Sequence, residues 1–168
     1  MRVGLLVMAM LVVAFLWAAS SSAVEEKSRL AELDAYWAEV SRAVREGDFK
    51  AYKATCHPDG VLVAGTHDRC HPLAKALAKW KKEFDDTKAG TRKSNVTFRF
   101  SRRLGDATTA HETGIFLYEW SNDQGEGGKE YIHCEFLLLK QDGVWKNMME
   151  YQKSKATAQQ WEALKEKK

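Results

Sequence analysis

The chain has 168 residues with 26 basic and 23 acidic side chains, so its formal net charge is only +3 at pH 7. This balance argues against nucleic acid as a partner, because a nucleic-acid-binding surface concentrates Lys and Arg on one face. Without the first 23 residues, discussed next, the chain has the length of one domain with room for a hydrophobic core.

Residues 1–23 have the pattern of a cleavable export signal. Arg2 precedes an apolar run that ends at Trp17, and this run is short for a membrane span. Ser21 and Ala23 provide the small residues that signal peptidase needs, so we expect cleavage near Ala23. The sequence therefore predicts an exported protein, periplasmic or secreted, with no membrane attachment after cleavage. An uncleaved N-terminal anchor is the alternative.

The first half of the mature chain predicts three helices. Apolar residues recur every three or four positions through residues 25–46, which is typical of an amphipathic helix. Gly47 suits the C-terminal cap of this helix, and Asp48 suits the N-terminal cap of a second, short one. A short apolar strand is expected at 61–64. Pro72 is well placed in the first turn of the third helix.

From residue 94 the apolar period changes to two, which predicts an antiparallel meander. We expect its four strands to begin near residue 94 and to continue at 107–120, 130–140 and 144–152. The predicted domain covers residues 24–155. Residues 156–168 predict a C-terminal helical tail whose only large apolar residues are Trp161 and Leu164, so we expect loose docking.

The expected strand 130–140 is apolar on both faces near its C-terminal end. One apolar face can pack on the helices, but the apolar side chains of the other face then need another surface to bury them. This pattern favours self-association, as a homodimer or a larger oligomer.

Three short motifs occur in a fixed order along the chain. They are Gly47-Asp48-Phe49-x-Ala51-Tyr52, Cys56-x-Pro58 and Asp142-Gly143-x-Trp145-x-Asn147. With the order of elements, they resemble the association domain of calcium/calmodulin-dependent kinase II and, more broadly, the SnoaL-like, nuclear-transport-factor-2-like (NTF2-like) superfamily. The resemblance extends from about residue 30 to residue 154. It implies an α+β fold shaped like a cone, with three N-terminal helices packed in a strongly curved antiparallel sheet around a pocket.

The functional residues of these families are not found at the corresponding positions of this chain. The arginines that line the pocket of the kinase domain correspond approximately to Gly114, Phe136 and Gln152 here. The catalytic aspartate of the ketosteroid isomerases in this superfamily falls near Ala64. We therefore expect no isomerase of that type, no cofactor and no confidently assigned catalytic residue.

Aromatic and polar residues that a cone would place inside are the candidates for a ligand pocket. A small, partly apolar molecule is the expected ligand. The candidate lining residues are Trp37, Tyr52, Glu112, Tyr118, Asn147 and Tyr151.

A group of His and Glu residues supports an alternative hypothesis, in which the protein is a small cofactor-independent lyase, isomerase or hydrolase. His133 and Glu135 share one strand face about 7 Å apart, and His111 on the neighbouring strand can approach them. In an apolar cone, such a pair could transfer a proton at neutral pH. The other interpretation is that these residues satisfy one another at the wetter end of the sheet or at a dimer interface.

Several cysteines and histidines lie close together in the sequence, but we do not expect a metal site. The strand at 61–64 separates them by roughly 13 Å, too far for one ion. Two other interpretations stay possible for these residues. Cys56 and Cys70 could form a disulfide, or all of them could simply be partly exposed residues at the ends of helices and loops. The five residues concerned are Cys56, His57, His67, Cys70 and His71. The leading hypothesis is thus an exported small-molecule-binding or oligomerisation domain.

Overall fold

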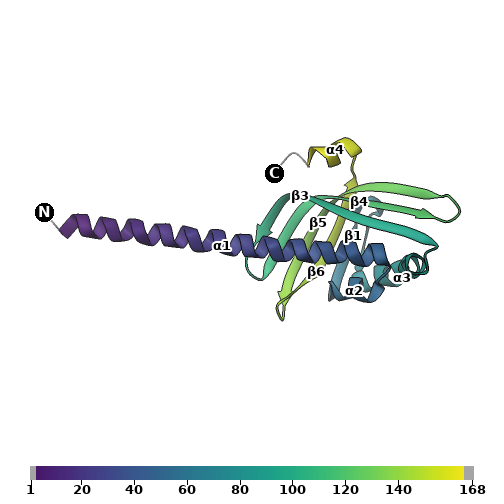
Figure 1. Cartoon of the computed structure of the whole chain (residues 1–168), viewed down its shortest axis with the longest axis horizontal. Helices are drawn as coiled ribbons and strands as arrows, with labels where there is room; N and C mark the ends of the chain where they lie inside the picture. Colours follow the sequence, from purple (N-terminus) through teal and green to yellow (C-terminus); the bar gives the residue numbers. More distant parts are fainter. Residues whose placement is uncertain (1–2, 165–168) are drawn as a thin grey trace.

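The computed structural model describes the backbone of residues 3–164 and the side chains of residues 24–164. Helices and strands follow one another along the chain as shown in Figure 1. They are α1 (Val3–Glu46), α2 (Phe49–Ala54), β1 (Cys56–Ala64), η1 (Gly65–His67), β2 (Arg69–Pro72), α3 (Leu73–Ala89), β3 (Arg92–Gly105), β4 (Thr109–Asn122), β5 (Gly127–Gln141), β6 (Val144–Lys155) and α4 (Ala158–Ala163).

Helix α1 is longer than the helix predicted at 25–46, because it already begins at Val3, and its first half extends away from the sheet (Figure 1). At the predicted cleavage site, the side chain of Ala23 and those before it lie outside the side chains that the structure describes. Export therefore stays a prediction. Within the described part of the chain, no helix has both the length and the apolar composition needed to cross a membrane.

The turn between α1 and α2 forms as its sequence predicts. Gly47 has a φ of +66°, and a Cβ there would lie 2.4 Å from the backbone nitrogen of Lys88 in α3. Asp48 caps α2 by accepting a hydrogen bond from the Ala51 backbone N–H at 3.0 Å. This segment therefore packs the first helix pair closely against the end of α3.

The described residues form a curved six-stranded sheet in the order β2-β1-β6-β5-β4-β3. The antiparallel meander β3–β6 and the α+β class are confirmed. Two features differ from the expectation. Strand β1 is longer than the predicted 61–64 and pairs in parallel with β6, and β2 adds an antiparallel edge strand. The start of β1 is irregular, because its register against β6 shifts between Cys56 and Val61.

The inner, concave face of the sheet holds the main core against α1. Trp37 of α1 packs against Phe98, Phe100 and Phe136, with ring centroids 4.4, 5.2 and 4.6 Å away. Alternate residues of β5 point into this core, namely Ile132, Cys134, Phe136 and Leu138. The intervening residues of β5 therefore face outward.

The prediction of a loosely docked tail is wrong. Helix α4 lies on the outer face of the sheet, where Trp161 is only 4% exposed and packs with Ile115 and Leu117. The Arg99 guanidinium lies 4.0 Å from the Trp161 ring and also donates to the Trp161 backbone oxygen. Sequence periodicity missed this docking because Trp161 contacts residues far away in the sequence, from Tyr131 to Arg99. Self-association through the remaining outer face stays a prediction.

Candidate functional site

A cavity of about 250 Å³ lies between the three helices α1–α3 and the inner face of the sheet. Its wall is mainly aromatic, with a few polar groups at separate positions. The aromatic lining residues are Tyr36, Trp37, Tyr52, Trp80, Phe84, Phe98, Phe116, Tyr118 and Phe136. Such a lining favours a flat, apolar molecule over a polar one.

One polar region of the cavity comes from strand β6. Glu150 is only 7% exposed, and its Oε1 accepts a hydrogen bond from Gln152 Nε2 at 2.6 Å. Burial raises the pKa of the Glu150 carboxyl. Asn147 is also buried, and its Oδ1 has no hydrogen-bond partner among the described residues. A buried, unpaired acceptor of this kind needs a partner from a ligand or a water molecule.

Two phenols complete this region. Tyr36 donates a hydrogen bond to the Thr55 backbone oxygen at 3.1 Å, whereas the Tyr52 hydroxyl makes none with a described residue. Burial raises the pKa of both phenols, and the nearby Glu150 adds to the effect. Both therefore keep their protons at neutral pH, and Tyr52 has a hydroxyl available to a bound molecule.

Cys56 also lines the cavity but is not prepared as a nucleophile. Its Sγ lies 3.6 Å from the Tyr52 backbone oxygen, and burial raises the pKa of the thiol to about 12. The thiolate that nucleophilic attack requires is therefore scarce at neutral pH.

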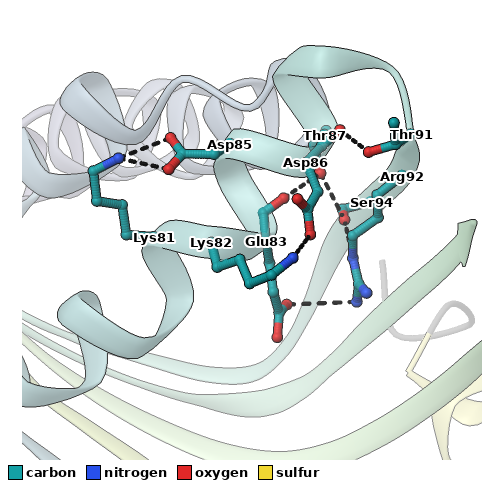
Figure 2. Close-up of polar contacts among 9 residues, drawn as sticks. All are labelled: Lys81, Lys82, Glu83, Asp85, Asp86, Thr87, Thr91, Arg92 and Ser94. Carbon is teal, nitrogen blue, oxygen red and sulfur yellow. Dashed lines mark hydrogen bonds and ion pairs between the residues drawn. The ribbon is translucent and has the colours of Figure 1, made fainter.

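The second polar region connects α3 with the start of β3. Tyr118 donates to Glu83 Oε2 at 2.9 Å, and Arg92 Nη2 lies 3.2 Å from the Tyr118 hydroxyl. Figure 2 shows Glu83 and Arg92 pointing toward one another, with 3.5 Å between Oε2 and Nη2. Glu83 and Tyr118 line the cavity.

Four of the six predicted pocket residues line the cavity, namely Trp37, Tyr52, Tyr118 and Asn147. Glu112 lies behind the wall, where it accepts hydrogen bonds from the Trp37 indole and from Arg103 Nε. Arg103 also reaches Asp34 at 2.5 Å. Glu112 is fully buried and holds the Trp37 ring in place.

The sixth predicted residue, Tyr151, is not part of the cavity wall, because a β-bulge changes the side-chain alternation of β6. Asn147 pairs with Leu138 and Met149 pairs with Leu137, so Met148 is an extra residue between them. Strict alternation from Asn147 would bring Tyr151 inward. The bulge instead brings Glu150 and Gln152 inward. Sequence reasoning missed Glu150, whereas the family resemblance had aligned Gln152 with a pocket position.

The predicted His–Glu set does form a contact, but it lies outside the cone. His111 Nε2 is 3.1 Å from Glu135 Oε2, on the outward-facing positions of β4 and β5. Lys153 donates to Glu135 Oε1 at 2.6 Å and, with His111, lowers the pKa of this carboxyl. His133 faces outward too, because Ile132, Cys134 and Phe136 fill the core. The set is therefore not placed for chemistry in the cavity.

Among the described residues, no group of three or more His, Cys, Asp or Glu side chains is arranged to hold a metal ion. Cys56, Cys70 and Cys134 carry free thiols. Cys56 is buried in the cavity wall, whereas Cys70 is exposed on β2.

Comparisons with known proteins give matches in structure only. Neither the family models nor the curated protein sequences match the chain. A putative calcium/calmodulin-dependent kinase II association domain from Exiguobacterium sibiricum has a TM-score of 0.60 and 14% identity, over 77% of this chain and 94% of that one. An NTF2-like protein of unknown function from Shewanella oneidensis has a TM-score of 0.57 and 15% identity, over 73% and 97%.

A ketosteroid isomerase-like protein from Erwinia carotovora has a TM-score of 0.56 and 21% identity, over 76% of this chain and 96% of that one. Identities this low establish the shared fold and carry no activity from one protein to another.

Proposed function

Because this chain has the NTF2-like fold, we propose that it binds a small, mostly aromatic or apolar molecule in its cavity. One observation carries the proposal: the unpaired Oδ1 of Asn147 lies in an otherwise aromatic cavity. A core that served only to hold the fold would gain by filling this space and pairing that atom. The arrangement is typical of a binding site with a few polar groups that orient its ligand.

The polar groups indicate what the ligand carries at this position. Asn147 Oδ1 accepts a hydrogen bond, so it favours a hydroxyl or an N–H on the ligand. The Tyr52 hydroxyl donates, and the raised pKa of Glu150 favours a neutral partner beside it. Since an apolar cavity of about 150 Å³ holds benzene, about 250 Å³ suits one or two rings. The ligand is therefore a compact aromatic molecule with a neutral donor.

Fluorescence titration with 2-naphthol tests this proposal, because the probe has two rings and one hydroxyl. We expect saturable binding to the wild type and about tenfold weaker binding to Asn147→Leu, which lacks the acceptor. Glu135→Gln is the matched control on the outer face and should bind as the wild type does. The absence of saturable binding of 2-naphthol by the wild type would contradict the proposal.

A second candidate function is proton transfer in the same cavity, and the position of Glu150 favours it. Glu150 is a buried carboxyl whose pKa is raised by burial, which makes it the candidate for a group that exchanges a proton with a ligand. The probe is 2-tetralone, whose deuterium exchange next to the carbonyl can be followed by NMR. Glu150→Gln should abolish any acceleration while retaining 2-naphthol binding. If wild type and Glu150→Gln give equal exchange rates, the cavity binds without catalysing this step.

The cellular setting of this binding is proposed from residues 1–23, which have the order of a cleavable export signal. We place the mature chain outside the cytoplasm. The mass of the protein recovered after export tests this, since cleavage after Ala23 removes residues 1–23. A full-length mass in the exported fraction would favour the uncleaved anchor.

Self-association is proposed from the outer face of β5, where Leu137 and Leu139 stay partly exposed beyond the area that α4 covers. Sedimentation equilibrium is the test, and Leu137→Asp should shift an oligomer toward monomer. A wild type that sediments as a monomer at all concentrations would exclude this part of the proposal.

A further inference from the structure

A basic groove adjoins the cavity. Thr87 and Ser94 line both hollows, and their hydroxyl oxygens lie 3.1 Å apart at the junction (Figure 2). The groove runs between the end of α3 and the β4–β5 hairpin, with Trp120 as its main aromatic residue. Its basic residues are Arg45, Arg92, Lys93 and Lys129. A molecule seated in the cavity therefore has a positively charged surface beside it.

Arg92 is held rigidly at this junction. Its guanidinium lies over the Trp120 ring at 4.4 Å, its Nε donates to Ser94 Oγ at 3.1 Å, and its side chain is 17% exposed. The Nη2 group faces Tyr118 and Glu83, whereas Nη1 makes no hydrogen bond with a described residue. A guanidinium fixed in this way is prepared to receive an anion without losing much side-chain freedom.

The Glu83 carboxylate shows what kind of group fits there. Its Oε2 lies between the Tyr118 hydroxyl and Arg92 Nη2, so two donors converge on one carboxylate oxygen. Burial raises the pKa of Tyr118, which keeps that hydroxyl a donor. The Glu83 side chain itself is 45% exposed and belongs to a helix surface, so it can turn into solvent. A carboxylate from a ligand can then occupy the same position.

The rest of the groove retains excess positive charge. Glu119 is the acidic residue in its lining, and it pairs with Lys129 at 2.6 Å. Within residues 24–164, Arg45 and Lys93 make no ion pair. Since the field of these two side chains is not cancelled locally, the groove attracts anions from solution.

We propose that the ligand is an amphipathic carboxylate, with its ring body in the aromatic cavity and its carboxylate at the Arg92–Tyr118 junction. The carboxylate displaces Glu83 from these two donors and faces Arg45 and Lys93. This inference rests on the proposed binding function and narrows it to one chemical class. Glu83 then acts as an internal competitor that occupies the anion position in the free protein.

The test compares neutral and charged probes that share one ring body. They are 2-naphthol, the naphthalene carboxylates with spacers of one to three methylenes, and the methyl ester of each carboxylate. At low salt, we expect at least one carboxylate to bind the wild type about tenfold more tightly than its ester. Added salt should reduce this advantage, because the groove charges are exposed.

Three substitutions identify the position of the head group. Arg92→Gln should remove the advantage of the carboxylate over its ester and leave the affinity for 2-naphthol within about twofold. Glu83→Gln should strengthen carboxylate binding without strengthening ester binding, an effect that mere loss of structure would not produce. Arg102→Gln is the matched control, because Arg102 is exposed on the same strand and outside the groove.

The two proposals fail separately in this experiment. If 2-naphthol binds but no carboxylate exceeds its ester, the carboxylate inference is overturned and the binding function stands. A carboxylate advantage that survives in Arg92→Gln also overturns the inference, because the head group then lies elsewhere. If neither 2-naphthol nor any ester or carboxylate binds the wild type, both proposals are overturned.

Discussion

Glu150 and Glu135 lie on neighbouring strands, yet they have opposite environments. Glu150 faces the cavity, where burial raises the pKa of its carboxyl. Glu135 faces outward between Lys153 and His111, and these groups lower its pKa. The same residue type therefore stays protonated to a higher pH on the inner face and ionises readily on the outer face. The face of the sheet, more than the identity of the residue, decides which chemistry is available.

The largest expected difference between the two faces concerns packing in β5. Phe136→Ala should lower the free energy of unfolding by about 3–5 kcal/mol, because the ring packs against Trp37 in the core. Leu137 is the next residue of β5 and faces outward, so Leu137→Ala should lower the free energy of unfolding by only about 1 kcal/mol. Urea denaturation measures both values. Equal losses would break the distinction between the faces.

The buried ion pair behind the cavity gives the next largest effect. Glu112→Ala should lower the free energy of unfolding by about 3 kcal/mol, because it leaves Arg103 and the Trp37 indole without their acceptor. Glu135→Ala breaks a more exposed pair with Lys153 and should cost at most about 1 kcal/mol. Chemical denaturation of the two variants checks this order, and a reversed order would be incompatible with it.

The contribution of Glu150 to the free energy of unfolding should decrease as the pH rises. Its folded pKa is raised, so the native state binds more protons than the unfolded chain between the two pKa values. Stability therefore falls as pH rises through this window. Glu150→Gln should remove the fall and be more stable than the wild type above the window. Unfolding free energies measured from pH 4 to pH 8 test this, and superimposable profiles would count against a buried Glu150.

The contribution of Glu135 to the free energy of unfolding should change with pH in the opposite direction. Its folded pKa is lowered, chiefly by Lys153, so its contribution is present above the unfolded pKa and is lost as pH falls through the folded pKa. At neutral pH, Glu135→Gln should lower the free energy of unfolding by at most about 1 kcal/mol. The difference from wild type should vanish in acid. A gain in stability at neutral pH would show that the pair with Lys153 is unfavourable.

The reactivity of the three thiols compares buried and exposed positions in the wild-type protein, without any substitution. Cys70 is exposed and should react quickly with Ellman's reagent, whereas Cys56 and Cys134 are buried and should stay protected. Burial raises the pKa of both protected thiols, that of Cys56 to about 12. Urea should release both buried thiols. Rapid reaction of Cys56 in the native state would indicate that the cavity wall is more open.

The elements of this fold could be predicted because their signals are local. The helix stripe of α1, the Gly47-Asp48 turn and the period-two pattern of β3–β6 all lie within short windows of sequence. The start of β1 gave no such signal, because Pro58 and Gly60 interrupt its alternation. Its parallel pairing with β6 joins residues about 90 positions apart, and no local pattern indicates that pairing.

The candidate site was predictable only in part, for the same reason. Trp37, Tyr52 and Tyr118 follow regular helix and strand spacing, so they were expected inside the cone, and they lie in the cavity wall. Glu83 and Arg92 lie on different elements, α3 and β3, and nothing in their spacing suggests that they meet. Their contact depends on how α3 packs over the start of the meander (Figure 2).

By itself, the sequence determined the α+β class, the helices and the meander, since hydrophobic periodicity and turn residues act over a few positions. Tertiary structure alone decided which residues in the second half of β6 face the cavity. One extra residue, Met148, shifts the alternation of β6, so that Glu150 points inward and Tyr151 outward. Because the side-chain period of a strand is two, this single residue determines that β6 contributes the Glu150 carboxyl to the cavity.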